Sequence, residues 1–487
     1  MLMQDLVAVL PELALVMTAL CMLMLGAFQG QASSNTVTFV SVVALLLAGI
    51  LASFDAAALF SSGEQNRSLF TGLLSYDSFA AFNRAAIFFA SATALFMARP
   101  HIIRKGYQRF EIPLLFLFSA LGMALMVSAN DMMTLFMGIE LMSLSLYVLA
   151  AMRQDDVRAS EAGLKYFILG ALSSGMILYG ISLVYGFAGA TNFDLLINNI
   201  GTFSASTLPF GLLVGLVFVI SGLAFKISAV PFHMWTPDVY QGAPTPITAF
   251  FAVAPKIAAI ALFLRVMMGP FGGISGQWQQ IIVVISIASM TYGAISAIRQ
   301  SSIKRLMAYS SIANMGFALV GLAAGSVEGS AASLTYTIIY AINSLGLFAV
   351  ILMMRRGEHP LDGITAFAGL SRVRPGVAFA MTILLLSITG IPPFGGFWGK
   401  WLVFQAALAQ GMVVLTVIGL LASVIAAFYY LRIIKLMYFD EAVETLDKME
   451  EPGLRIVAWF FAIITVLLVI LTDVLYGWTS VAVSIFS

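Results

Sequence analysis

The chain is a succession of long apolar segments separated by short polar connections. A helix needs roughly 20 apolar residues to cross a bilayer, and the 487 residues contain fourteen such segments. The two longest, 209–235 and 376–408, both contain proline, including Pro231 and Pro393. The pattern predicts membrane helices near 5–27, 36–58, 76–98, 112–128, 130–151, 163–188, 209–235, 247–268, 278–298, 304–325, 331–354, 376–408, 412–437 and 455–480.

Composition supports a polytopic membrane protein, because 61% of the residues are hydrophobic and only 10% are charged. A soluble domain carries about 25% charged residues. The net charge of +1 gives no reason to expect nucleic acid as a partner. Cys21 is the only cysteine, and His101, His233 and His359 lie far apart in sequence, so neither a cysteine-based cluster nor a paired-histidine haem site is expected. We expect no metal and no cofactor site in this chain.

Basic residues in the connections test the helix count, because Lys and Arg accumulate in cytoplasmic loops. The N-terminal stretch lacks the basic region and cleavage pattern of a signal peptide, so it is interpreted as the first membrane helix. Of the basic residues in the connections between helices, only Arg67 falls in an even-numbered connection. Fourteen spans with both termini outside fit this distribution. The others all fall in odd-numbered connections: Arg99, Arg104, Lys105, Arg109, Arg153, Arg158, Arg299, Lys304, Arg305, Arg355, Arg356, Arg372, Arg374, Arg432, Lys435, Lys448 and Arg455.

Six basic residues lie within the predicted spans. Arg84 and Arg265 fall near the outer helix ends, where long side chains extend to the interface, so we expect them to be ordinary interfacial residues. Lys165 lies one turn inside the cytoplasmic end of its helix, where it either extends to the interface in the same way or takes part in function. Ionisable residues deep in a membrane are rare and mark functional sites, and three lysines are too deep for the interfacial explanation: Lys226, Lys256 and Lys400.

Glu140 supplies a matching acid. It lies about 15 Å inside its helix, near the midplane of the bilayer. At an assumed separation of about 6 Å and an effective dielectric near 20, its attraction to Lys226 would be ~2.8 kcal/mol. That energy corresponds to about a hundredfold change in a protonation equilibrium. A pair that opens and closes would therefore act as a proton switch without a cofactor.

Proline breaks and an internal repeat give these charges a framework. Proline removes a backbone donor and breaks a helix, and the sequences VPFHMW and PPFGGFWGKW place Pro231 and Pro393 at matching positions in helices 7 and 12. Helices 6 and 11 share a spaced Leu, Tyr and small polar pattern, and five spans separate them. The pattern predicts an inverted repeat with broken helices. The division of the chain is 1–111, then repeats 112–270 (helices 4–8) and 271–440 (helices 9–13), then 441–487.

These residues suggest a relay. Lys256 would take a proton from Lys226 through water, and Lys400 would release it outward. His233 either relays protons on the inner side of the break or hydrogen-bonds the loosened backbone, because imidazole titrates near pH ~6.5. Helix 11 presents a polar face that either holds water or serves as ordinary packing: Tyr336, Tyr340, Asn343 and Ser344.

Four sequence runs resemble the antiporter-like membrane subunits of respiratory complex I: FHMWTPDVYQGAPTPITAF, GLKYFILGALSSG, IKRLMAYSSIANMG and IPPFGGFWGK. The N-type subunit, the counterpart of mitochondrial subunit 2, is the nearest pattern. The resemblance implies an all-α fold of fourteen helices with two inverted five-helix repeats and broken helices 7 and 12. A lysine at the helix 12 position favours the N-type over the M-type and antiporter D-type subunits. The family's titratable positions fall on Glu140, Lys165, Lys226, Lys256 and Lys400.

The resemblance further implies that this chain moves protons while electrons pass from NADH to quinone in partner subunits. FMN, iron–sulfur clusters and quinone would lie in those partners, beside neighbouring antiporter-like subunits. A bacterial inner membrane, rather than an organellar one, is the expected location, with both termini periplasmic. Two alternatives stay open. One is the D-type subunit of a sodium/proton antiporter complex, and the other is a scaffold whose buried charges only lock helices together.

Overall fold

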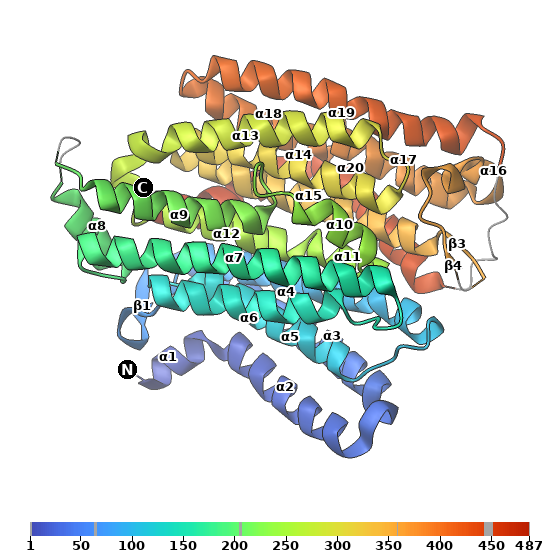
Figure 1. Ribbon diagram of the computed structural model, residues 1–487, viewed down its shortest axis with the longest axis horizontal. Coiled ribbons are helices and arrows are strands. Elements are labelled where there is room, and N and C mark those ends of the chain that lie inside the picture. The colour runs from blue at the N-terminus through green and yellow to red at the C-terminus, as the bar shows by residue number, and fades with distance from the viewer. Residues whose placement is uncertain (1, 63–65, 204–206, 358, 443–450, 487) are drawn as a thin grey trace.

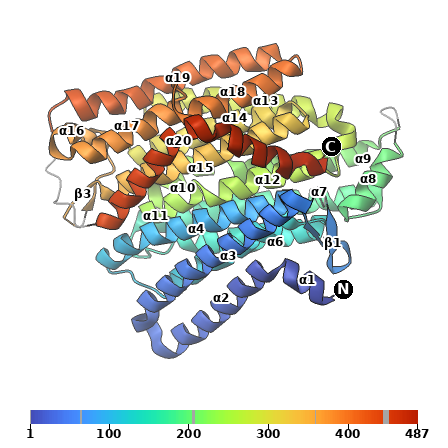
Figure 2. The same cartoon turned by 180° about the vertical axis from the view of Figure 1, so that it is seen from behind.

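The protein is a bundle of long helices that run roughly side by side, as the computed structural model in Figures 1 and 2 shows. The structure describes residues 2–62, 66–203, 207–357, 359–442 and 451–486, so the predicted loop residue Lys448 lies outside the described residues. Within them, twelve stretches are long and apolar enough to span a membrane. That number counts α2 and α3 as one stretch, although they are two crossings. It also omits α17 and α18, which are the two halves of one broken helix. Fourteen crossings result, as the sequence predicts.

The first part of the chain forms a peripheral unit of three spanning helices. A β-hairpin pairs β1 with β2 in antiparallel register before α4 begins. The side chain of Asp77 caps α4 by accepting from the backbone N–H of Ala80 at 2.7 Å. The unit consists of α1 (Leu2–Ala8), α2 (Leu10–Gln29), η1 (Gly30–Ser33), α3 (Ser34–Ser62), β1 (Arg67–Leu69), η2 (Phe70–Gly72), β2 (Leu74–Tyr76) and α4 (Ser78–Arg104).

The first repeat follows. Its predicted helix 8, 247–268, is two helices here, because Val253 leaves helical geometry between them. The short helix α8 in the connection after α7 was not predicted. The repeat consists of α5 (Glu111–Ser128), α6 (Met132–Ala150), α7 (Val157–Ala188), α8 (Phe193–Gly201), α9 (Phe210–Ile227), α10 (Trp235–Gly242), α11 (Thr245–Phe251) and α12 (Ala254–Met268).

The second repeat and a last helix complete the chain. Both ends of the chain lie at the same end of the bundle (Figure 1), as an even number of crossings requires. The elements are η3 (Gly272–Ile274), α13 (Ser275–Ile298), α14 (Ile303–Ala323), α15 (Val327–Met353), β3 (Arg355–Arg356), β4 (His359–Pro360), η4 (Ile364–Phe367), α16 (Leu370–Val373), α17 (Pro375–Thr389), α18 (Gly395–Ala409), α19 (Val413–Phe439), α20 (Pro452–Val483) and η5 (Ser484–Phe486).

The two predicted helix breaks are confirmed and resemble each other. In the first, α9 ends at Ile227 and Ser228 takes a left-handed conformation with φ 64°. In the second, α17 ends at Thr389 and Gly390 has φ 90°. Each left-handed residue lies three positions before the proline of its break, Pro231 or Pro393, and both prolines follow a cis peptide bond. The breaks leave helix termini in the interior of the bundle.

The centre of the bundle is formed by α12, α14 and α15. The apolar stretches containing α12 and α14 are 100% buried, whereas those of α7, α19 and α20 are 39% buried. Buried positions dominate α12 on all sides because it packs against α4, α5, α9 and α15. A helix that is apolar all round requires such a central position. The charged residues of α12 are therefore enclosed by protein.

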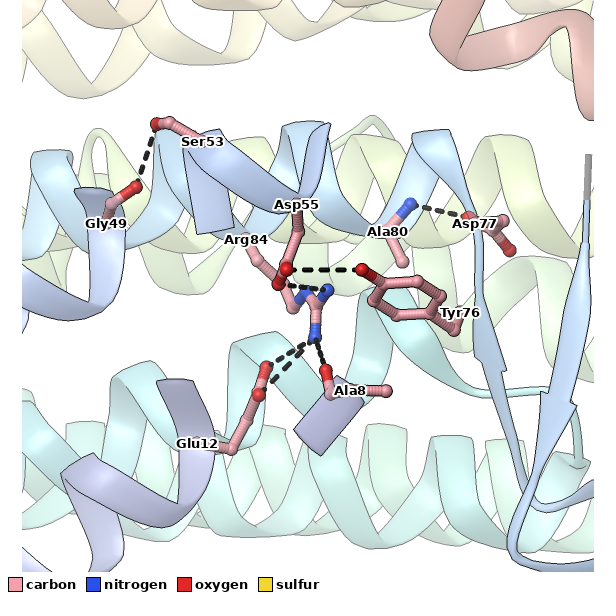
Figure 3. A network of polar contacts seen from close by, with 9 residues as sticks. All are labelled: Ala8, Glu12, Gly49, Ser53, Asp55, Tyr76, Asp77, Ala80 and Arg84. Atoms are coloured by element: carbon pink, nitrogen blue, oxygen red, sulfur yellow. Dashed lines mark hydrogen bonds and ion pairs between the residues drawn. The ribbon is translucent and has the colours of Figure 1, made fainter. Parts of the chain in front are cut away.

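The expectation that Arg84 and Arg265 extend to the interface is wrong. Both side chains are buried, and the guanidinium of Arg265 contacts both carboxylate oxygens of Asp77 at 2.8 and 2.9 Å. Arg84 forms ion pairs with Glu12 at 3.2 Å and Asp55 at 3.6 Å (Figure 3). Each arginine is held inside because a carboxylate from another part of the chain meets it there.

Candidate proton-transfer site

Three lysines lie buried in the interior, close to the two helix breaks. The exposed fractions are 7% for Lys226, 1% for Lys256 and 5% for Lys400. Lys226 belongs to the last turn of α9 and Lys256 to the first turn of α12. Within the described part of the chain, none of the three has a carboxylate within the 4.0 Å of an ion pair. Neutral oxygens receive their N–H groups instead, which leaves their charge uncompensated at close range.

Lys226 and Glu140 each have a serine as hydrogen-bond partner. The ammonium of Lys226 donates to the hydroxyl of Ser143 at 2.8 Å, and Ser143 lies one turn from Glu140 on α6. The hydroxyl of Ser174 on α7 donates to the carboxylate of Glu140. The negative charge of Glu140 acts electrostatically on Lys226. The two groups are therefore neighbours on facing helices without direct contact.

Lys256 lies at the first helix break and contacts residues on both sides of it. Its ammonium donates to the hydroxyl of Ser228 at 2.5 Å, and the hydroxyl of Thr236 donates to the same oxygen at 2.6 Å. The ammonium also lies 5.4 Å from the centre of the Trp235 ring, within the range of a cation–π contact. Ser228 thus caps α9 with its backbone and holds Lys256 with its side chain.

Lys400 lies at the second helix break and contacts the last residue of the helix before it. Its ammonium donates to the carbonyl oxygen of Thr389 at 2.7 Å and to the hydroxyl of Ser423 at 2.8 Å. Thr389 is the last residue of α17, where the helix dipole is negative and favours a cation. A Cβ built on Gly390 would lie 2.9 Å from Cδ of Lys400. The glycine therefore leaves room for the lysine as well as ending the helix.

A buried polar cluster lies on α14, α15 and α19 in the second repeat. The hydroxyl of Tyr336 donates to Oδ1 of Asn314 at 2.6 Å, and Nδ2 of Asn314 donates to the carbonyl of Ser310 at 2.7 Å. The hydroxyls of Ser310 and Tyr430 share a hydrogen bond of 2.5 Å. Ser310 and Tyr430 are thus joined hydroxyl to hydroxyl, and the Asn314 amide connects them to Tyr336. Sequence reasoning identified Tyr336 but missed Asn314, Ser310 and Tyr430, for which a polar residue in an apolar helix is the available signal.

The remaining polar face of α15 is buried as well. Asn343 donates to the carbonyl of Ile339 at 2.8 Å and accepts from Thr465 at 3.3 Å. Among the described atoms, the hydroxyls of Tyr340 and Ser344 have no hydrogen-bond partner. Buried polar groups are nearly always satisfied by protein or ordered water.

Lys165 lies apart from the three buried lysines. Its side chain is 41% exposed and pairs with Glu161 at 2.7 Å and Asp238 at 2.9 Å. Asp238, on α10, also accepts from Arg305 at 2.7 Å. Burial opposes ionisation of Asp238, but the hydrogen bonds from Lys165 and Arg305 outweigh it, so the pKa of Asp238 lies below its usual value. The structure therefore places Lys165 in an ion-pair cluster with Asp238 of α10, and not in the interior of the bundle.

His233 lies within the first break, between α9 and α10. Its ring meets that of Tyr292 on α13 edge to face, with centroids 4.6 Å apart. The structure thus places His233 beside the second repeat, and the choice between a relay and a backbone partner stays a prediction.

The comparisons with known proteins agree with this architecture. Residues 129–426 match the family described as NADH:quinone oxidoreductase/Mrp antiporter, TM, and this range contains both breaks and all three buried lysines. A chain of respiratory complex I from Thermus thermophilus with bound aureothin is 28% identical, with a TM-score of 0.81, and the match covers 96% of this chain and 98% of that one. A chain of the Mrp complex from Dietzia sp. has a TM-score of 0.86 at 21% identity, with 99% and 97% covered, and shares the fold. The protein is thus an antiporter-like membrane subunit.

A relative that matches over most of both chains identifies the type of subunit. The NADH-quinone oxidoreductase subunit N of Paramagnetospirillum magneticum is 51% identical over 446 residues, which is 91% of this chain and 90% of the relative. The chain belongs to the family of NADH-quinone oxidoreductase N subunits.

Proposed function

We propose that this chain translocates protons as the N-type membrane subunit of an NADH:quinone oxidoreductase, and that Glu140, Lys226, Lys256 and Lys400 carry the protons. The observation that supports this most is the burial of three lysines without a carboxylate contact. A buried ion pair would hold each ammonium in one charge state, whereas a serine or carbonyl partner accepts a hydrogen bond from either form. Such lysines can gain and lose a proton.

The geometry suggests the order of transfer. Glu140 stabilises charge on Lys226, and loss of that attraction releases a proton toward Lys256 through the polar first break. The polar residues of α15, among them Tyr336 beside Gly399, would then lead through the second repeat to Lys400. Moving one charge against about 100 mV costs ~2.3 kcal/mol. Redox chemistry in partner subunits would supply that energy.

The partners and location follow from family membership. FMN, iron–sulfur clusters and quinone would lie in other subunits, since one cysteine, Cys21, falls short of the four thiolates of a typical cluster. Neighbouring antiporter-like subunits and the lipid bilayer would cover the exposed apolar helices. We place the protein in a bacterial inner membrane with both termini periplasmic, because the basic connections belong to the opposite end.

Purification and reconstitution test the proposal. We expect flavin and iron–sulfur subunits to copurify, and NADH oxidation to drive proton uptake into vesicles. Lys226→Ala and Glu140→Ala should lower coupled turnover strongly while assembly persists. Lys435→Ala is the matched control, because Lys435 is a lysine whose side chain is 68% exposed. Unchanged turnover in both interior variants would favour a scaffold, and sodium-driven exchange without NADH would favour an antiporter subunit.

A further inference from the structure

A second group of charges, two of them buried and one, Asp55, with a side chain 25% exposed, lies outside the two repeats in the N-terminal three-helix unit. It joins Glu12 on α2, Asp55 on α3 and Arg84 on α4 (Figure 3). Nη1 of Arg84 donates to both carboxylate oxygens of Glu12, at 3.2 and 3.4 Å, and to the carbonyl of Ala8 at 3.3 Å. Nη2 of Arg84 lies 3.6 Å from Asp55. The hydroxyl of Tyr76 donates to the other oxygen of Asp55 at 3.1 Å.

The cluster has one carboxylate more than it has cations. Of the described basic side chains, Arg84 is the one that pairs with Glu12 and Asp55. The neighbouring charges are balanced without them, because Asp77 pairs with Arg265 and Asp5 pairs with Arg67. Glu12, Asp55 and Arg84 would together carry one uncompensated negative charge. Burying such a charge is costly, and protonation of one carboxylate removes the cost.

A cavity lined mainly by apolar residues adjoins this cluster. It has a volume of about 180 Å³ and lies between α2, α5 and the β-hairpin, with Glu12 and Arg84 in its wall. Arg84 is 2% exposed, and its Nε has no hydrogen-bond partner among the described atoms. Arg84 is six residues from the start of α4, or about 9 Å from the end of the helix. Asp55 does not line the cavity, but its side chain is 25% exposed, so it can exchange protons from outside the protein.

We propose that Glu12, Asp55 and Arg84 form a proton-binding site, separate from the lysines of the repeats, in which Asp55 holds the proton. Glu12 takes the two hydrogen bonds of the guanidinium, while Asp55 is beyond hydrogen-bond distance from it. Among the residues that the structure describes, the charged and titratable groups that face Asp55 are Arg84 from α4, Glu12 from α2 and Tyr76 from β2. The site exchanges protons with the outer side and does not depend on the lysine relay.

Infrared difference spectroscopy of the purified complex tests this site. We expect the wild type to show the carbonyl band of a half-buried protonated carboxylic acid that disappears at alkaline pH. Asp55→Asn should remove the band. Glu12→Gln should remove it as well, because Asp55 would then be the sole carboxylate of Arg84 and would ionise. Asp5→Asn, at a carboxylate with its own arginine, should leave the band unchanged.

Two results would overturn the proposal. A band that survives Asp55→Asn would show that the proton lies elsewhere, and one that survives Glu12→Gln would show that the excess charge is not its cause. Tyr76→Phe provides a measurement on a milder variant. Loss of its hydrogen bond should shift the band to higher frequency, and an unshifted band in an assembled complex would also contradict the assignment. The rate of NADH oxidation serves as the check on assembly.

Discussion

Ser228 offers the sharpest test of the first helix break. Its hydroxyl accepts hydrogen bonds from Lys256 at 2.5 Å and Thr236 at 2.6 Å, while its backbone has φ 64°. A hydrogen bond to a charged group contributes about 1.5–3 kcal/mol. If the protonated form of Lys256 loses ~2 kcal/mol of stabilisation, the ratio of protonated to neutral lysine falls about thirtyfold. We therefore expect Ser228→Ala and Ser228→Gly to lower NADH-driven proton pumping by about tenfold or more.

The two variants separate the hydroxyl from the backbone. Glycine adopts a left-handed conformation freely, whereas alanine there costs about 1 kcal/mol. The glycine variant should thus be more stable than the alanine variant in thermal denaturation, yet pump equally poorly. Ser221→Ala is the control, because Ser221 is a half-buried serine on the same helix whose hydroxyl donates to the carbonyl of Val217. Pumping at the wild-type rate in both Ser228 variants would refute the role assigned to the hydroxyl.

Three other predictions follow from the geometry. Arg84→Met should destabilise the N-terminal unit by about 3–5 kcal/mol, because it leaves carboxylates in the interior without a cation. Limited proteolysis of the assembled complex would detect this destabilisation. Resistance to proteolysis equal to that of the wild type would contradict the prediction. Asp238→Asn should remove a small stabilisation, less than about 1 kcal/mol because the side chain is partly exposed. Since the folded pKa of Asp238 is lowered, the contribution is present above the unfolded value of ~3.9 and lost as pH falls below it, so melting temperatures of the two proteins should converge in acid. Gly390→Ala should displace Lys400 and slow pumping several-fold without preventing assembly, and normal pumping would show that Lys400 tolerates displacement.

The spans, the two breaks and the depth of the lysines could be predicted because each depends on local sequence. Apolar run length sets the spans, Pro231 and Pro393 mark the breaks, and Lys256 lies mid-segment in the chain itself. The pairing of Arg265 with Asp77 could not be predicted in the same way. Those residues are 188 positions apart, and the hydropathy of each segment carries no information about which helices become neighbours.

The neutral partners of the lysines were missed for a different reason. Serine is common in membrane helices, where its hydroxyl bonds the carbonyl one turn back, so Ser143 and Ser423 have no distinctive sequence signal. Only the approach of Lys226 on α9 to α6, and the packing of α18 against α19, gives them a lysine partner. The sequence therefore predicts which charges are buried, while the three-dimensional structure shows what satisfies them.

The most direct test of the proposed relay is the NADH-driven proton pumping of reconstituted complex carrying Lys226→Met or Lys400→Met, measured beside Lys435→Met. Methionine preserves side-chain length and burial but cannot carry a proton. The proposal predicts a strong loss of coupled pumping in both interior variants, with assembly intact and the Lys435 control unaffected. Wild-type pumping rate and proton-to-electron stoichiometry in both interior variants would contradict it.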